Sequence, residues 1–172
     1  MPRQSDGETS PRRGDSETLT VSSRYSPVGS SPSGANGIPP RRGQKVSIQG
    51  RAIYRGQAHG LALVSTAAIG FLGGVDPETG VVIEAGHPLY GQSVAGRVLV
   101  FPTGKGSTVG SYTLYRLAKK GLAPAGIINA RSEAIVAVGA IISGVPMVDL
   151  IDISQIETGD TVEIDGEDVR IG

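Results

Sequence analysis

A glycine-rich loop near the middle of the chain carries most of the side chains that could do chemistry. It reads Phe101-Pro-Thr-Gly-Lys-Gly-Ser-Thr-Val-Gly-Ser111 and lies between an apolar run and a segment with helical spacing. Gly104 and Gly106 allow a tight turn and let a ligand approach the backbone closely. Unpaired N–H groups at the start of a helix favour an anion, and Lys105 adds a positive charge. The loop predicts an anion site, although a capped helix that binds nothing fits the same residues.

Three hydroxyl residues follow the lysine of this loop. Ser107 or Thr108 can cap the helix, and Ser111 lies one turn further along the same face. Ser107 could be a nucleophile only with a His partner, and no pattern connects it to either histidine of the chain. It could be a base if Lys105 and aligned N–H groups stabilised its alkoxide in a site closed to water.

The loop departs from the phosphate loop of nucleoside triphosphatases in two ways. That motif begins with a glycine five residues before the Gly of its Gly-Lys pair, and Leu99 occupies this position. Lys105 is followed by Gly106 rather than by a hydroxyl residue. We therefore exclude the ATPase and GTPase classes.

Further candidate site residues lie in a second loop and at the end of a predicted strand. The loop Gly73–Gly80 includes Gly74 and Asp76, which predict either a structural turn or a ligand-facing loop. Asn129 and Arg131 follow a buried run, so we expect them at the same sheet edge as Ser107. Arg131 suits a carboxylate or a phosphate, and a plain surface arginine is the alternative.

The composition excludes several function classes. The 172 residues contain no Cys, which excludes disulfides, thiolate zinc sites and an iron–sulfur cluster ligated by this chain. His59 and His87 are the available imidazoles, and we expect both to be structural. The formal charge of zero argues against a nucleic-acid partner. No membrane span or secretory signal is apparent, so we expect a cytoplasmic protein.

The composition changes near residue 45. Residues 1–45 contain 9 Ser, 6 Pro and 6 Gly and few apolar residues, so we predict a disordered extension. Residues 46–172 are apolar and rich in Gly, and their length is that of one domain.

The pattern of this second part predicts mostly strands and two helices. We expect strands at 46–54, 60–65, 97–102, 126–130 and 145–151, and a short strand or strand end at 81–86. We also expect a turn at 55–59 and a hairpin over 161–172. We expect helices at 111–121 and at 132–144, the latter capped by Ser132 and Gly144, with a strand as its alternative. The order predicts a three-layer α/β domain with a partly parallel central sheet and hairpins on either side.

Three separated motifs resemble one known family. FLGGVDPETG, VFPTGKGSTVGSY and INARSEAIVAVGAIISGVPMVD are similar, in this order, to the small subunits of archaeal-type phosphomevalonate dehydratases, the swivel-domain half of the aconitase X group. The resemblance covers about residues 46–172. It implies the swivelling β/β/α fold of aconitase-like enzymes.

The resemblance also implies a function. A separate large subunit would carry a [4Fe–4S] cluster on its own cysteines, and the heterodimer would dehydrate (R)-5-phosphomevalonate to trans-anhydromevalonate 5-phosphate in a modified mevalonate pathway. Ser107 matches the proton acceptor of the family. The remaining candidates would help to bind substrate; these are Gly104, Lys105, Gly106, Thr108, Ser111, Gly74, Asp76, Asn129 and Arg131.

Two alternative functions remain open. A small subunit of a cis-3-hydroxy-L-proline dehydratase would share the architecture. A non-catalytic module that binds an anion or scaffolds a partner is the alternative of another class.

Overall fold

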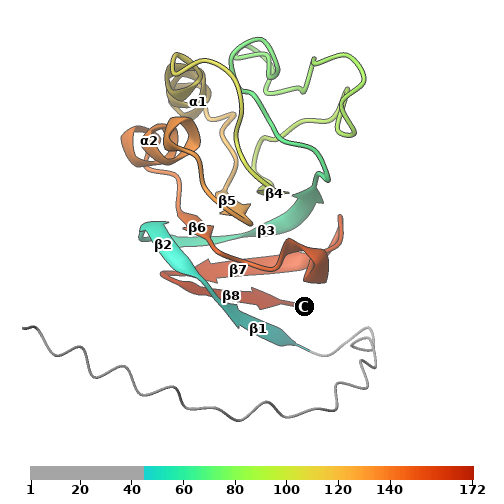
Figure 1. Ribbon diagram of the computed structural model, residues 1–172, viewed down its shortest axis with the longest axis vertical. Coiled ribbons are helices and arrows are strands. Elements are labelled where there is room, and N and C mark those ends of the chain that lie inside the picture. Colours follow the sequence, from blue (N-terminus) through green and yellow to red (C-terminus); the bar gives the residue numbers. More distant parts are fainter. Residues whose placement is uncertain (1–44) are drawn as a thin grey trace, which may run out of the picture. The chain divides into compact units, whose positions relative to one another are not determined.

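The computed structural model describes residues 45–172, in which eight strands and two helices follow one another (Figure 1). The strands are β1 (Val46–Gln49), β2 (Arg51–Tyr54), β3 (Gln57–Val64), β4 (Val98–Phe101), β5 (Gly126–Asn129), β6 (Met147–Asp149), β7 (Thr161–Asp165) and β8 (Asp168–Ile171). The helices are α1 (Gly110–Lys119) and α2 (Ala134–Ser143), with a short 3-10 helix at Ile153–Gln155. The predicted extension over residues 1–45 lies outside the described residues except for Lys45, and it stays a prediction.

All eight strands belong to one sheet with the order β1-β8-β7-β3-β4-β5-β6-β2. β3, β4, β5 and β6 are parallel neighbours, and β2 pairs with β6 in the antiparallel sense. β7, β8 and β1 continue the sheet beyond β3 as antiparallel strands. The predicted strand–helix–strand–helix–strand segment forms the parallel part, and the predicted hairpin over 161–172 forms β7 and β8.

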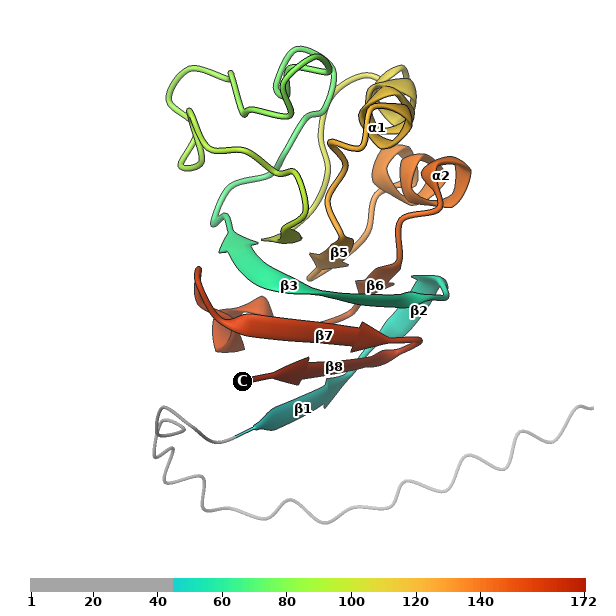
Figure 2. The same ribbon diagram turned by 180° about the vertical axis from the view of Figure 1, so that it is seen from behind.

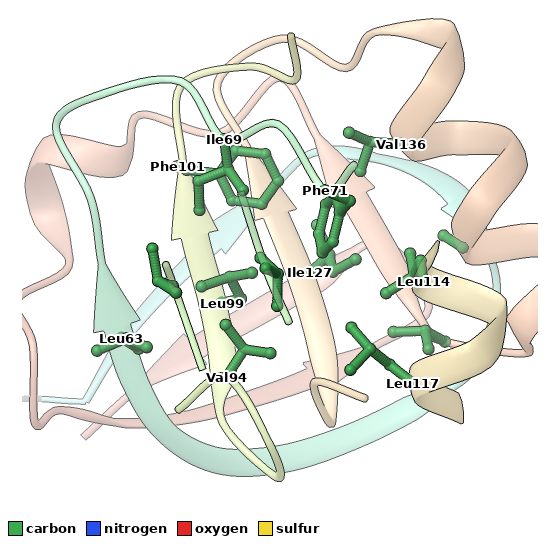
Figure 3. Packing of buried hydrophobic residues seen from close by; sticks show 14 of the residues in the cluster. Leu63, Ile69, Phe71, Val94, Leu99, Phe101, Leu114, Leu117, Ile127 and Val136 are labelled. Carbon is green, nitrogen blue, oxygen red and sulfur yellow. The ribbon is translucent and has the colours of Figure 1, made fainter. Parts of the chain in front are cut away.

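The chain is arranged in three layers. Figures 1 and 2 show α1, α2 and the long connection after β3 on one side of the parallel strands, with β7, β8 and β1 on the other. Side chains of β4 and β5 alternate between two cores. Leu99 and Ile127 pack towards the helices, as Figure 3 shows, and Val98 and Ile128 pack against the antiparallel strands. Burial on both faces explains the continuous apolar runs and confirms the predicted β/β/α class.

The segment 46–54 reaches both ends of the sheet. β1 pairs with β8 at one end and β2 pairs with β6 at the other, with Gly50 between them. A Cβ atom at Gly50 would lie 2.4 Å from the carbonyl oxygen of Asp149 and 2.7 Å from Cγ1 of Val148. Glycine is therefore the residue that allows the backbone to cross at this point.

Three expectations about the strands were wrong. The segment 46–54 forms two strands rather than one, and neither pairs with β3, so the expected N-terminal hairpin is absent from the described fold. The turn expected at 55–59 is shorter, because β3 already begins at Gln57. Residues 81–86 form only the isolated bridges Val75–Val82 and Val81–Ser93 instead of a strand. Local alternation predicts extended backbone, but it does not select the pairing partner.

Both predicted helices are confirmed, with one change at a cap. Gly144 ends α2 in the left-handed conformation, as predicted. Glu133 rather than Ser132 is the N-cap, and its carboxylate accepts a hydrogen bond from the N–H of Ile135. Among residues 45–172, no helix is long and apolar enough to cross a membrane.

We expect Gly50→Ala to lower the free energy of unfolding by about 1–3 kcal/mol, because the new methyl group overlaps the backbone of β6. Urea denaturation of the purified chain measures this change. Ser47→Ala, at an exposed position of β1, is the control and should shift the value by less than about 0.5 kcal/mol. Equal stabilities of the two variants would contradict the crossing constraint.

Candidate functional site

The predicted glycine-rich loop connects β4 to α1 at the carboxyl end of the parallel strands. Its backbone pairs with the segment after β3, where Ile69 and Gly104 form a parallel bridge. The N–H of Lys105 donates to the carbonyl of Ile69 at 3.0 Å, and the N–H of Ile69 donates to the carbonyl of Thr103 at 3.2 Å. These bonds hold the first half of the loop as an extension of the sheet.

The start of α2 packs against the other side of the loop. A Cβ atom at Gly104 would lie 2.4 Å from Cγ2 of Val136 and 3.7 Å from Cβ of Glu133. The N–H of Arg131 donates to the carbonyl of Pro102 at 3.0 Å. Gly104 therefore has a steric role, because any side chain there would push the loop away from α2.

Ser107 lies at the exposed end of this loop. Its Oγ accepts a hydrogen bond from the N–H of Val109 at 3.2 Å, and its carbonyl accepts one from the N–H of Gly110 at 2.9 Å. Ser107 thus caps a turn that precedes α1, whereas the helix itself begins after Val109 without a side-chain cap. The hydroxyl remains exposed and keeps its proton free to be donated or removed.

The available N–H groups differ from those expected at a helix start. The first N–H groups of α1 donate to carbonyls of the preceding turn, as in the bond from Ser111 to Thr108 at 3.3 Å. Within residues 45–172, no hydrogen bond occupies the N–H groups of Gly106, Ser107 and Thr108. Gly106 has φ +95°, a conformation that glycine adopts readily. The loop itself, rather than the helix, offers donors to an anion.

Lys105 is paired with a carboxylate that sequence reasoning missed. Its Nζ donates to Glu84, and both side chains are partly exposed. Oε2 of Glu84 also lies 3.5 Å from the position that a Cβ atom would occupy on Gly74. The pair brings the second predicted loop beside the glycine-rich loop and partly offsets the charge of the lysine. No local pattern signals this contact, because 21 residues separate the partners.

The residues of the second predicted loop are divided between two places. Gly74 packs tightly on the carbonyl of Gly70, so it shapes the end of the loop that lies near Glu84. The carboxylate of Asp76 accepts hydrogen bonds from the N–H of Glu78 at 2.9 Å and from Oγ1 of Thr79 at 3.0 Å. Asp76 therefore holds a local turn, and its role in binding substrate stays a prediction.

The same turn is anchored at the far end of α1. Glu78 accepts hydrogen bonds from Arg116, at 2.7 Å, and from Lys120. The bond from Lys120 and the two positive charges hold the pKa of the Glu78 carboxyl below its usual range. Lys120 is thirteen positions after Ser107, so this anchor lies at the opposite end of α1 from the serine.

Ser111 and Asn129 are buried and bonded within the framework. Oγ of Ser111 donates to the carbonyl of Ile135 at 2.7 Å, which joins α1 to α2. Nδ2 of Asn129 donates to the carbonyl of Phe101 at 2.9 Å, which joins the ends of β4 and β5. Oδ1 of Asn129 has no hydrogen-bond partner among the described residues. The side chain of Arg131 is exposed beside these residues.

A buried carboxylate fixes the segment that carries Arg131. Asp149 is completely buried and accepts two hydrogen bonds from Arg51, at 2.9 and 2.8 Å. It also accepts bonds from the N–H of Ser132 at 3.0 Å and from its Oγ at 2.6 Å. Burial opposes its charge, but the bonds from Arg51 and Ser132 outweigh this and hold the pKa of the Asp149 carboxyl below its usual value.

Neither histidine forms a hydrogen bond with Ser107 among residues 45–172. Nδ1 of buried His87 accepts a bond from the N–H of Leu89 at 3.1 Å, so Nε2 carries the proton that faces the carbonyl of Ala68 at 3.2 Å. His87 thus joins two parts of the long connection, as expected of a structural residue. His59 lies exposed on β3 rather than in a turn.

The fold and this loop define the chain as a swivelling β/β/α domain of the aconitase type. The profile of the aconitase X swivel domain matches residues 47–171. The chain belongs to the aconitase X swivel-domain family. Because its relatives are dehydratase subunits, the chain is part of a dehydratase, which is a hydro-lyase. The resemblance seen in the sequence is thereby confirmed.

The similarity extends over nearly the whole length of the relatives. The chain is 61% identical over 124 residues to the phosphomevalonate dehydratase small subunit of Methanocella arvoryzae, covering 70% of this chain and 94% of that protein. It is 53% identical over 126 residues to the protein of that name from Methanosarcina acetivorans, covering 72% and 88%. The crystal structure of Thermococcus kodakaraensis aconitase X in its holo-form matches with a TM-score of 0.73 and 51% identity, covering 74% and 98%.

We expect Asp149→Asn to lower the free energy of unfolding by about 1–3 kcal/mol near neutral pH, because Arg51 and Ser132 lose a charged acceptor. The pKa of Asp149 is lower in the folded chain than in the unfolded chain, where it is about 3.9. The native chain therefore has this stabilisation at pH values above the unfolded pKa and loses it as the pH falls through the folded pKa. Denaturation curves recorded from about pH 2 to about pH 7 measure both the loss of stability and its dependence on pH. The variant should lack this part of the acid dependence, and an unchanged profile would contradict the role of Asp149.

Proposed function

We propose that this chain is the small subunit of a phosphomevalonate dehydratase, in which Ser107 is the proton acceptor. One observation carries the assignment of the residue: an exposed serine hydroxyl lies in a loop whose adjacent N–H groups have no partner among residues 45–172. The names of the relatives support the substrate, and the word "small subunit" in those names supports a larger partner.

The reaction would be an elimination of water. A base removes a proton from the carbon next to the carboxylate, the new carbon–carbon double bond forms, and the hydroxyl group on the next carbon leaves as hydroxide. The hydroxide takes up a proton and is released as water, and the base returns its own proton to solvent, so that the net loss is one water molecule. Oγ of Ser107 would need to be an alkoxide to accept this proton. The N–H groups of Gly106 and Thr108 and the ammonium of Lys105 would stabilise that negative charge or an oxygen of the substrate.

The other candidate residues divide by what they contact. Arg131 is exposed beside the loop and would suit the carboxylate or the phosphate of the substrate. Ser111 and Asn129 would act through the framework, because their hydrogen bonds join α1 to α2 and β4 to β5. Gly74 and Asp76 would shape the connection that carries Glu84.

An iron–sulfur cluster would have to be held by the partner subunit. The chain has no Cys, and residues 45–172 contain no group of three His, Asp or Glu side chains that could hold a metal ion. The residues of this chain therefore do not fit such a cluster.

We expect Ser107→Ala, assembled with the large subunit, to lower turnover of (R)-5-phosphomevalonate by about 10²–10⁴-fold, because the elimination loses its base. Ser47→Ala, at an exposed position of β1, is the matched control and should retain full turnover. A Ser107→Ala complex with near-native turnover would contradict the assignment. Activity of the native complex on cis-3-hydroxy-L-proline instead would favour the alternative dehydratase, and a chain without any partner would favour the non-catalytic module.

A charge exchange tests how Lys105 acts. We expect Lys105→Glu to lower kcat/KM by about 10–100-fold, because a carboxylate replaces the ammonium of the residue two positions before Ser107. Adding Glu84→Lys restores the ion pair with its partners exchanged but leaves the negative charge on the loop. The double variant should regain thermal stability without regaining kcat/KM. Recovery of kcat/KM in the double variant would mean that the pair is only a structural contact.

A further inference from the structure

The outer surface of α2 is apolar and uncovered by the rest of the described chain. The helix Ala134–Ser143 contains no charged residue, and Val138, Ile141 and Ile142 are 48%, 50% and 42% exposed. A helix that is hydrophobic on all sides is normally buried on all sides. This helix has one side that lacks a covering partner within residues 45–172.

The neighbouring side of α1 extends the same apolar surface. Figures 1 and 2 show α1 and α2 side by side on the outer layer. Tyr112 and Tyr115 of α1 are 65% and 36% exposed. The two helices border a groove of about 530 Å³, lined by Thr108, Ser111, Tyr112, Tyr115, Ala134, Ile135, Val138 and Ile142.

This groove begins beside the candidate site. Thr108, at its rim, is the residue that follows Ser107. Val109 is half exposed at the start of α1, and exposed Leu72 approaches the same point, with its backbone nitrogen 3.4 Å from a Cβ position on Gly110. Of the eleven large apolar residues exposed among residues 45–172, seven therefore gather on this face or at its rim. We call this set the α1–α2 face; its members are Leu72, Val109, Tyr112, Tyr115, Val138, Ile141 and Ile142.

We propose that the α1–α2 face is the surface on which the large subunit docks. The inference rests on the proposed function, which requires a second subunit to close over Ser107. Thr108, which lines the groove, and Val109 directly follow Ser107 in the chain, so a surface that covers the serine also meets the start of the groove. The groove lining is uncharged, so the complementary patch of the large subunit is apolar, with its polar contacts at the rim.

The position of the groove favours the large subunit over a second copy of this chain. A two-fold pair of chains would pair this patch with an identical one and would bring to Ser107 no group that this chain lacks, whereas the proposed function requires a different subunit there. A stable interface buries about 800 Å² on each side, so docking would extend from the groove to the glycine-rich loop. The same contact would therefore hold the subunits together and exclude water from the candidate site.

The test compares aspartate substitutions at positions of equal exposure. Val138→Asp and Ile141→Asp lie on the α1–α2 face, and Leu61→Asp on β3, 48% exposed, is the control. None of the three residues belongs to the proposed catalytic loop. We expect each α2 variant to weaken binding of the full-length chain to the large subunit by about 10–100-fold, and the control by less than about threefold. Titration with the purified large subunit measures the Kd, and circular dichroism checks that each variant is folded.

A second measurement does not depend on these variants being well folded. Because the chain has no Cys, Val138→Cys and Leu61→Cys each introduce a unique thiol. Addition of the large subunit should protect the thiol at position 138 from maleimide and should leave the thiol at position 61 reactive. Mass spectrometry of this chain measures the extent of maleimide labelling. Equal reactivity at the two positions in the assembled complex would overturn the proposal.

Other occupants predict different results. A dimer of this chain that the α2 variants disrupt, with unchanged binding of the large subunit, would overturn the proposal in favour of a second copy. Protection of position 138 that disappears on deletion of residues 1–44 would assign the face to that segment instead. If the α2 variants disrupt a complex that does not dehydrate phosphomevalonate, the docking surface stands and the proposed substrate fails.

Discussion

The contact of Gly104 with its two neighbours is the constraint on which the rest of the site depends. Its backbone pairs with Ile69 on one side, and Val136 of α2 fills the space of its missing side chain on the other. This packing fixes the direction in which the loop leaves β4. It thereby places the exposed hydroxyl of Ser107 in the turn before α1. Both the layer of helices and the long connection after β3 therefore help to position the glycine-rich loop.

The site offers an anion donors of a different kind from those of a simple helix start. The first N–H groups of α1 are used by the preceding turn, in which Ser107 takes part through both its carbonyl and its hydroxyl. Among residues 45–172, the free donors are the N–H groups of Gly106, Ser107 and Thr108, which begin in the glycine turn. Lys105 also lies in that turn, and its ion pair with Glu84 partly offsets its positive charge. The electrostatic environment of Ser107 therefore depends on the connection 65–97 as much as on the loop itself.

Much of the fold could be predicted because its signals are local. The apolar runs of β4 and β5, the helical spacing of α1 and the Gly144 cap each occupy a few consecutive residues, and all correspond to observed elements. The errors concern contacts across the chain. Ser132 has the side chain of an N-cap, but buried Asp149 binds it and Glu133 caps the helix in its place. Glu84 and Asp149 gave no signal in the sequence, because their partners approach only after the strands have paired.

The crossing at Gly50 has a consequence for how the domain is made. Val46, at the start of the described domain, pairs with Ile171, next to the last residue of the chain, and the strand after Gly50 pairs with β6. Both ends of the sheet therefore depend on contacts of long sequence separation, which are slow to form. During synthesis the parallel strands and their helices can assemble first, while the layer of β7, β8 and β1 stays open until β8 has been made. Closure of that layer completes the second core, so the nascent domain exposes β-strand edges until β8 has paired with β7 and β1.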